Sequence, residues 1–177
     1  MAPGLIRSTA RQLIDGSPML TPFPTSVLAP AFTPVLAAIA IASAVAGVDQ
    51  ACKAVVRAVL GDRTLSLGVF GSLRIVESGI WLRRGLRMRR DQSRLVMWRA
   101  LVGGASGALV ASALVPVVAP WFGLALGGAI SHALETAWRG SVCDYVCPSF
   151  WPAFNLADVA LAVGATGVLL QLARYLL

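Results

Sequence analysis

The chain is 177 residues long, and its amino-acid composition is strongly apolar. Hydrophobic residues make up 57% and charged residues 13%, whereas soluble domains carry about 25% charged residues. The net charge is +7 and the mean hydropathy is +0.76. These values exclude an ordinary soluble enzyme and a disordered tail protein, and they indicate an integral membrane protein.

Long uncharged stretches predict four membrane-spanning helices. A helix needs about 20 apolar residues to cross a bilayer, so the charge-free stretch 16–48 supplies one helix after a leader with several prolines. The charge-free stretch 100–134 is too long for one span, and Pro116 and Pro120 divide it into two helices. These runs are also too long for the strands of a membrane barrel. The expected helices are, in chain order, about 31–48, 95–115, 121–138 and 156–177.

The rest of the chain is expected to lie outside the bilayer. Residues 1–30 are interpreted as an N-terminal arm, because a cleavable signal peptide has its apolar core close behind a short basic start. Residues 64–73 alternate as a β-strand does, so the connection 50–94 is expected to contain short strands. Pairing the helices as hairpins places this connection and the shorter one, 139–155, on the same face of the membrane.

A cluster of seven arginines lies between Arg83 and Arg99, with Asp91 as its only acid. We interpret this cluster as an amphipathic segment lying on anionic lipid headgroups. By itself the cluster favours a cytoplasmic location for its face of the membrane. Nucleic-acid binding is not expected, because the cluster adjoins a membrane span and has few aromatic residues between its charges.

Titratable side chains in or beside the spans are functional candidates, because ionisable groups are costly in a bilayer. Glu135 ends the third helix and Asp158 begins the fourth, so their carboxyl groups are expected to meet at one depth. Such a pair shares a proton and can activate a water molecule. Alternatively, each acid caps a helix or pairs with an arginine. His132 is the only histidine, so no metal site and no cofactor are expected.

The three cysteines leave two alternatives open. Cys143 and Cys147 lie in the connection between the last two helices, where they would form a local disulfide if that face is extracytoplasmic. Buried free thiols are an equally good interpretation. Because Cys52 makes the number odd, at least one thiol is unpaired within the chain.

Several short motifs occur together in one order. The most specific is Asn155-Leu-Ala-Asp158 at the start of the last helix. It resembles the Asn-x-Ala-Asp element of the lipoprotein signal peptidases, the signal peptidase II family. Asp49-Gln-Ala-Cys-Lys53 resembles the family's Asp-Gln-x-x-Lys, and Gly140-Ser-Val-Cys-Asp144-Tyr resembles its Gly-x-Val-x-Asp-Phe. The weaker matches are Gly127–Thr136 with Gly-Gly-x-x-Gly-Asn-x-x-Asp-Arg, and Val76–Gly79 with Asn-x-Gly.

The resemblance covers about residues 31–177 and implies an all-α membrane protein. Its fold would be a four-transmembrane-helix bundle with a small extracytoplasmic β-cradle and an amphipathic interfacial segment after the first helix. It implies an intramembrane aspartic-type endopeptidase of the bacterial cytoplasmic membrane that acts on lipidated or membrane-anchored precursors. The catalytic pair would be Glu135, in place of the family's first aspartate, and Asp158. The residues implied in substrate binding or site support are Asp49, Lys53, Glu77, His132, Asp144 and Asn155.

Departures from the family pattern support a second hypothesis. Glu135 is one methylene longer than aspartate, and a displacement of ~1 Å can cost ~100-fold in a positioned reaction. His132 and Thr136 also differ from the family's Asn and Arg, and Glu77 from its Asn. The alternative is therefore a non-catalytic homologue that acts as a binding or assembly subunit for another membrane protein.

Overall fold

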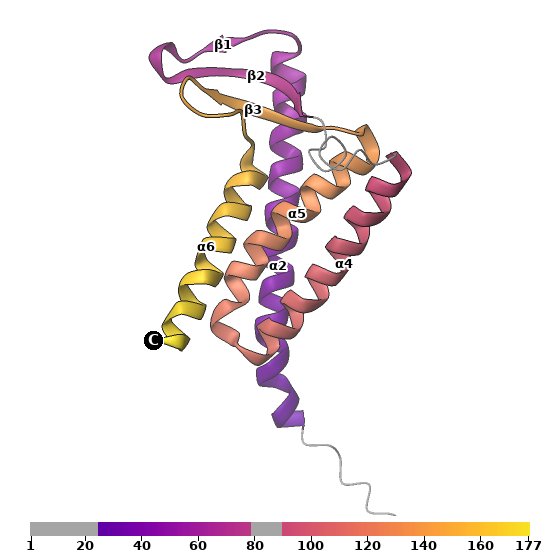
Figure 1. The fold of residues 1–177 in the computed structure, drawn as a ribbon, viewed down its shortest axis with the longest axis vertical. Helices are drawn as coiled ribbons and strands as arrows, with labels where there is room; N and C mark the ends of the chain where they lie inside the picture. The colour runs from indigo at the N-terminus through magenta and orange to yellow at the C-terminus, as the bar shows by residue number, and fades with distance from the viewer. Residues whose placement is uncertain (1–24, 79–89) are drawn as a thin grey trace, which may run out of the picture.

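Four long helices form a bundle with a small sheet at one end (Figure 1). The computed structural model describes residues 25–78 and 90–177. The helices are α2 (Thr25–Leu60), α4 (Arg90–Leu114), α5 (Ala119–Arg139) and α6 (Leu156–Leu176). Four stretches, one at each helix, are long and apolar enough to cross a membrane, namely Phe32–Leu60, Leu95–Leu114, Pro116–Arg139 and Leu156–Tyr175. The third also includes the short helix η2 (Pro116–Val118) that precedes α5. The prediction of a four-helix membrane protein is confirmed.

The first helix is longer than the sequence predicted. It was expected at about 31–48, and it runs from Thr25 to Leu60. Asp49, Lys53 and Arg57 recur every four residues, so they share one face of α2. That face meets α5, where Glu135 pairs with both cations. Because these charges are neutralised inside the bundle, the helix continues past the point where its apolar pattern ends.

The sheet joins two connections that are distant in the sequence. Its strands β1 (Leu65–Ser66), β2 (Gly71–Ser78) and β3 (Val142–Pro148) are antiparallel in the order β1-β2-β3, with the short helix η1 (Gly68–Phe70) between the first two. Strands in the first connection were predicted, and β3 was not. Gly71 has a φ of 127°, and a Cβ there would lie 2.3 Å from the carbonyl oxygen of Cys147. Only glycine fits at this position, where the start of β2 pairs with the end of β3.

Other expected segments fall partly outside the described residues. Of the predicted N-terminal arm, residues 1–24 lie outside, and α2 already begins at Thr25. The predicted interfacial segment is described only from Arg90 onward, where it forms the start of α4 rather than a separate helix. The division into an arm and a membrane domain therefore stays a prediction. The same holds for the side of the membrane on which the sheet lies.

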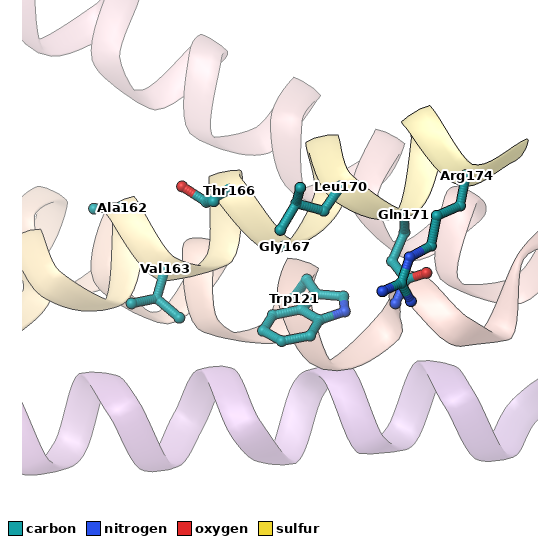
Figure 2. A pocket seen from close by; sticks show the side chains of 8 residues that line it. All are labelled: Trp121, Ala162, Val163, Thr166, Gly167, Leu170, Gln171 and Arg174. Atoms are coloured by element: carbon teal, nitrogen blue, oxygen red, sulfur yellow. The ribbon is translucent and has the colours of Figure 1, made fainter. Parts of the chain in front are cut away.

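Small residues allow the helices to approach closely around α5, which packs against α2, α4 and α6 (Figure 1). A Cβ on Gly127 would lie 2.7 Å from the carbonyl oxygen of Ala42 in α2. Elsewhere on α5, Trp121 lies against Gly167 of α6, and both residues line a groove together with Arg174 (Figure 2). Such small-residue contacts replace the hydrophobic driving force that is absent between helices in lipid.

The close contact at Gly127 predicts a large effect of a side chain there. Gly127→Val would push α2 and α5 apart and should lower the free energy of unfolding by about 1–3 kcal/mol. Gly107→Val in α4 is the matched control, because a Cβ at Gly107 meets nothing within 4 Å. Unfolding in detergent micelles, followed by circular dichroism, measures both. Equal losses in the two variants would contradict close packing of α2 on α5.

Candidate functional site

Buried polar side chains gather at the end of the bundle that carries the sheet. They come from α2, α5, β3 and the start of α6, and they are Asp49, Lys53, Ser131, Glu135, Thr136, Asp144 and Asn155. Polar groups are costly to bury in a membrane protein unless they find partners. They form two adjoining sets, here named the ion-pair cluster (Asp49, Lys53, Arg57, Glu77 and Glu135) and the carboxyl cluster (His132, Asp144, Asn155 and Asp158).

The ion-pair cluster is centred on the fully buried ammonium group of Lys53. Its Nζ lies 2.7 Å from Oδ2 of Asp49 and 2.8 Å from Oε2 of Glu135. Oε1 of Glu135 pairs with Nη2 of Arg57, which also lies 3.7 Å from Oε1 of Glu77. Both oxygens of Glu135 are therefore held by cations, and its carboxylate is charged and fixed.

Asp49 connects this cluster to the last helix. Its Oδ2 accepts a hydrogen bond from Oγ of Ser131 at 2.5 Å, and its Oδ1 accepts one from the backbone N–H of Ala157 at 3.0 Å. Gln50 in turn donates from Nε2 to Oγ of Ser131 at 2.8 Å. The N–H of Ala157 belongs to the first turn of α6, where backbone donors have no partner within the helix. One carboxylate thus holds α2, α5 and the start of α6 together.

The carboxyl cluster is organised by Asn155, the N-cap of α6. Asn155 and Asp158 form a capping box: Oδ1 of Asn155 accepts from the Asp158 N–H at 3.1 Å, and Oδ2 of Asp158 accepts from the Asn155 N–H at 2.9 Å. Nδ2 of Asn155 donates to Oδ1 of Asp144 at 2.7 Å. Asn155 therefore contacts both carboxyl groups, although one belongs to β3 and the other to α6.

His132 completes the carboxyl cluster from α5. Its Nε2 lies 3.3 Å from Oδ1 of Asn155 and 3.5 Å from Oδ1 of Asp158. The imidazole is thus close enough to restrict the Asp158 side chain while leaving it accessible. The Asp158 side chain is 38% exposed, so it can meet water or a bound ligand.

The two acids of the carboxyl cluster have different environments. Asp144 is buried, and burial raises the pKa of its carboxyl group; the nearby charge of Asp158 raises it further. Hydrogen bonds from Ser78 and Asn155 oppose this shift without cancelling it. A buried acid with a raised pKa beside a more exposed acid is the kind of asymmetry that general acid–base chemistry uses.

The structure brings some predicted site residues together and separates others. Asp158, His132, Asn155 and Asp144 form one set, whereas Glu135 lies in the other with Asp49, Lys53 and Glu77. Asp144, which the sequence suggested only as a supporting residue, is the acid that Asn155 holds beside the first turn of α6. Catalytic roles for Glu135 and Asp158 stay predictions.

Sequence reasoning missed Arg57 as a partner of Glu135. Its signal was present, because Arg57 lies one helical turn beyond Lys53 and two beyond Asp49. Cys52, Cys143 and Cys147 are free thiols in the structure. This agrees with the free-thiol alternative and not with a disulfide between Cys143 and Cys147. Burial raises the pKa of the Cys143 thiol, which disfavours the thiolate form that acts as a nucleophile.

Comparisons with known proteins identify the family. The family model for signal peptidase (SPase) II matches residues 41–174, so the chain belongs to the signal peptidase II family. The lipoprotein signal peptidase of Syntrophomonas wolfei is 32% identical over 126 residues, which is 63% of this chain and 83% of the relative. That of Halothermothrix orenii is 40% identical over 50 residues, which is 28% of this chain and only 34% of the relative.

Solved structures agree with this fold. Two structures described as bacterial membrane enzymes match with TM-scores of 0.65 and 0.63. The first is 18% identical and covers 76% of this chain and 91% of its own, and the second is 19% identical and covers 77% and 87%. At this identity they show the fold alone. The chain is a multi-pass membrane protein whose four-helix bundle and small sheet are those of its family.

The ion-pair cluster predicts a strong dependence of stability on Lys53. Lys53→Met would leave Asp49 and Glu135 without their shared cation, and removing one partner of a buried pair costs about 3–5 kcal/mol. Arg99→Met removes an exposed charge from α4 and is the control. Unfolding in detergent micelles compares the two variants. A loss for Lys53→Met no larger than that for Arg99→Met would contradict the central position of Lys53.

The raised pKa of Asp144 predicts how stability depends on pH. In the unfolded chain an aspartate ionises near its ordinary pKa of 3.8, and in the folded protein Asp144 ionises at a higher pH. Between these two values the folded state binds more protons, so stability decreases as pH rises, and above them the full cost of the buried charge remains. Asp144→Asn removes this titration.

Unfolding temperatures measured from about pH 4 to about pH 8 test this prediction. The wild type should lose stability relative to Asp144→Asn as pH rises through the folded-state pKa of Asp144. Parallel curves for the two proteins would show that Asp144 titrates as an ordinary aspartate.

Proposed function

We propose that this protein is an intramembrane aspartic-type endopeptidase that cleaves lipidated precursor proteins in the bacterial cytoplasmic membrane. The observation that carries the proposal is the contact of Asn155 with both Asp144 and Asp158, two acids in contrasting environments. Relatives that bear the name lipoprotein signal peptidase support the substrate class. The reacting carboxyl groups are proposed to be Asp144 and Asp158.

The proposed reaction assigns one role to each acid. Ionised Asp158, which is exposed, takes a proton from a water molecule, and the water oxygen bonds to the carbonyl carbon of the scissile peptide. Protonated Asp144 donates a hydrogen bond to the carbonyl oxygen, where negative charge develops. When the carbon–nitrogen bond breaks, the departing nitrogen takes the proton from Asp158. Asn155 positions both acids, and His132 positions Asp158.

Glu135 has a structural role in this proposal. Lys53 and Arg57 occupy its two oxygens, so it is held as an ion and has no free oxygen to receive or supply a proton. Its ion pairs hold α5 against α2 at the end of the bundle that carries the sheet. The earlier hypothesis, a Glu135–Asp158 pair, requires Glu135 to leave both cations before it can react.

An apolar groove next to the carboxyl cluster suits the lipid part of such a substrate. It has a volume of about 340 Å³ and lies where α2, α5 and α6 meet. Its walls include Val45, Val48, Leu124, Val159 and Val163, and it exposes no polar surface. Val159 directly follows Asp158 in the chain. An acyl chain in this groove would bring the attached peptide to Asp158 at the end of the span.

Anionic lipid headgroups are also proposed as partners of the arginines between Arg83 and Arg99. Arg99 is exposed near the start of α4, close to the end of the membrane-spanning stretch Leu95–Leu114. That depth is where a guanidinium meets phosphate groups. This contact would steady the start of α4 at the membrane surface, and it is independent of peptide cleavage.

Cleavage of a diacylglyceryl-modified prolipoprotein by the purified protein tests the proposed function. Asp144→Asn and Asp158→Asn should each reduce the rate by about 100- to 10,000-fold, because each removes a proton-transfer group. Glu135→Gln should keep cleavage per folded molecule within about tenfold, although it should lower stability. Unfolding curves for every variant separate folding from chemistry.

Two outcomes would contradict the proposal. A folded Glu135→Gln variant that is as inactive as Asp158→Asn, together with an active Asp144→Asn variant, would favour the Glu135–Asp158 pair. A wild-type protein that does not cleave, in an assay where a relative does, would favour the non-catalytic binding subunit.

A further inference from the structure

A polar hollow lies on the sheet side of the bundle, apart from the carboxyl cluster. Its volume is about 640 Å³, and polar atoms form most of its lining. Four arginines line it from four different parts of the fold: the end of α2, the turn that follows it, β2, and the end of α5. They are Arg57, Arg63, Arg74 and Arg139.

The hollow has an excess of positive charge. Its lining contains two carboxylates, Asp62 and Glu77, against the four guanidinium groups. Arg57 is engaged with Glu135 and Glu77. Within the described part of the chain, no carboxylate forms an ion pair with Arg63, Arg74 or Arg139, whose side chains are exposed. Three guanidinium groups therefore face the same hollow with their charge available.

The depth of the hollow matches the headgroup region of a bilayer. The membrane-spanning stretch of α2 ends at Leu60, and that of α5 ends at Arg139. Trp138, beside Arg139, is 72% exposed, and an exposed tryptophan at the end of a span is typical of the membrane interface. The hollow therefore has an exposed apolar side chain at its edge on the α5 side.

We propose that this hollow binds the phosphate of an anionic phospholipid headgroup. Arginine forms paired, charge-assisted hydrogen bonds with phosphate oxygens, and guanidinium groups from separate elements can surround one phosphate. The acyl chains of the lipid would pass Trp138, which is exposed beside Arg139. This apolar side chain at the end of a span favours a lipid over a free phosphate ion as the source of the phosphate.

The bound lipid would also stabilise the end of the bundle. Arg57 belongs both to the hollow and to the ion-pair cluster, so a phosphate there adds a negative partner beside Glu77. It would hold the ends of α2 and α5 and strand β2 in one arrangement. This site does not depend on the proposed peptidase activity, because none of its arginines belongs to the carboxyl cluster.

Lipid retention measured by native mass spectrometry tests the site. The full-length protein in detergent is titrated with phosphatidylglycerol, with phosphatidylcholine, or with inorganic phosphate. We expect phosphatidylglycerol to bind at least about tenfold more tightly than phosphatidylcholine, and inorganic phosphate at equal concentration not to displace it. Arg74→Gln/Arg139→Gln should weaken phosphatidylglycerol binding by at least about tenfold, since hydrogen bonds to charged groups are lost.

A control variant separates a built site from general charge attraction. Arg174→Gln removes one guanidinium group from an exposed position outside the hollow and should leave binding within about twofold. Its match is the single variant Arg74→Gln, which should weaken binding by more than twofold. Equal weakening by Arg174→Gln and Arg74→Gln would overturn the proposal. Displacement of the lipid by inorganic phosphate would show that the hollow binds a free phosphate ion, and it would overturn the proposal of a lipid headgroup. Unfolding curves confirm that every variant is folded.

Discussion

The buried ammonium group of Lys53 is the interaction on which the rest of the site depends. It neutralises Asp49 within its own helix and Glu135 on α5, and it lies fully inside the bundle. A charge buried this deeply is stable only when every partner is in place. Asp49 then binds the N–H of Ala157 and fixes the start of α6. The buried charge of Lys53 therefore positions Asn155 and Asp158 through Asp49.

The contrast between the two clusters explains how one small bundle contains four buried or half-buried acids with different properties. Asp49 and Glu135 both pair with the ammonium group of Lys53. Asp144 accepts hydrogen bonds from the neutral groups of Ser78 and Asn155, and burial together with the nearby charge of Asp158 raises its pKa. Asp158 is partly exposed beside His132. Division of labour among chemically similar side chains follows from their surroundings rather than from residue type.

The helices were predictable from the sequence because their signal is local. Long uncharged runs and the prolines at 116 and 120 placed three of the four spans within a few residues of their observed ends. The end of α2 was not predictable in this way. Asp49, Lys53 and Arg57 look like the boundary of a span until the helix that neutralises them is known. Strand β3 was missed for a related reason, because its partner β2 is distant in the sequence.

The site was only partly predictable. The sequence motifs identified eight candidate residues, and all eight lie in one of the two clusters. Glu77 belongs to its cluster through the pair with Arg57, which the motifs did not identify. The grouping of the eight candidates was not predictable, because the short connection between Glu135 and Asp158 suggested a pair. The side chains of Arg57 and Lys53 turn Glu135 toward α2, and Asn155 turns Asp144 toward α6. Such orientations depend on three-dimensional contacts that residue spacing does not contain.

The most direct test of the Asp144–Asp158 pair is the pH dependence of kcat/KM for cleavage of a lipid-modified precursor by the wild type and by Glu135→Gln. An essential acid and an essential base produce a bell-shaped profile whose two limbs report their apparent pKa values. If Asp144 and Asp158 share the proton, both limbs stay in place when Glu135 is replaced. A limb that moves or disappears in Glu135→Gln would show that Glu135 titrates in the reaction, and it would contradict the assignment.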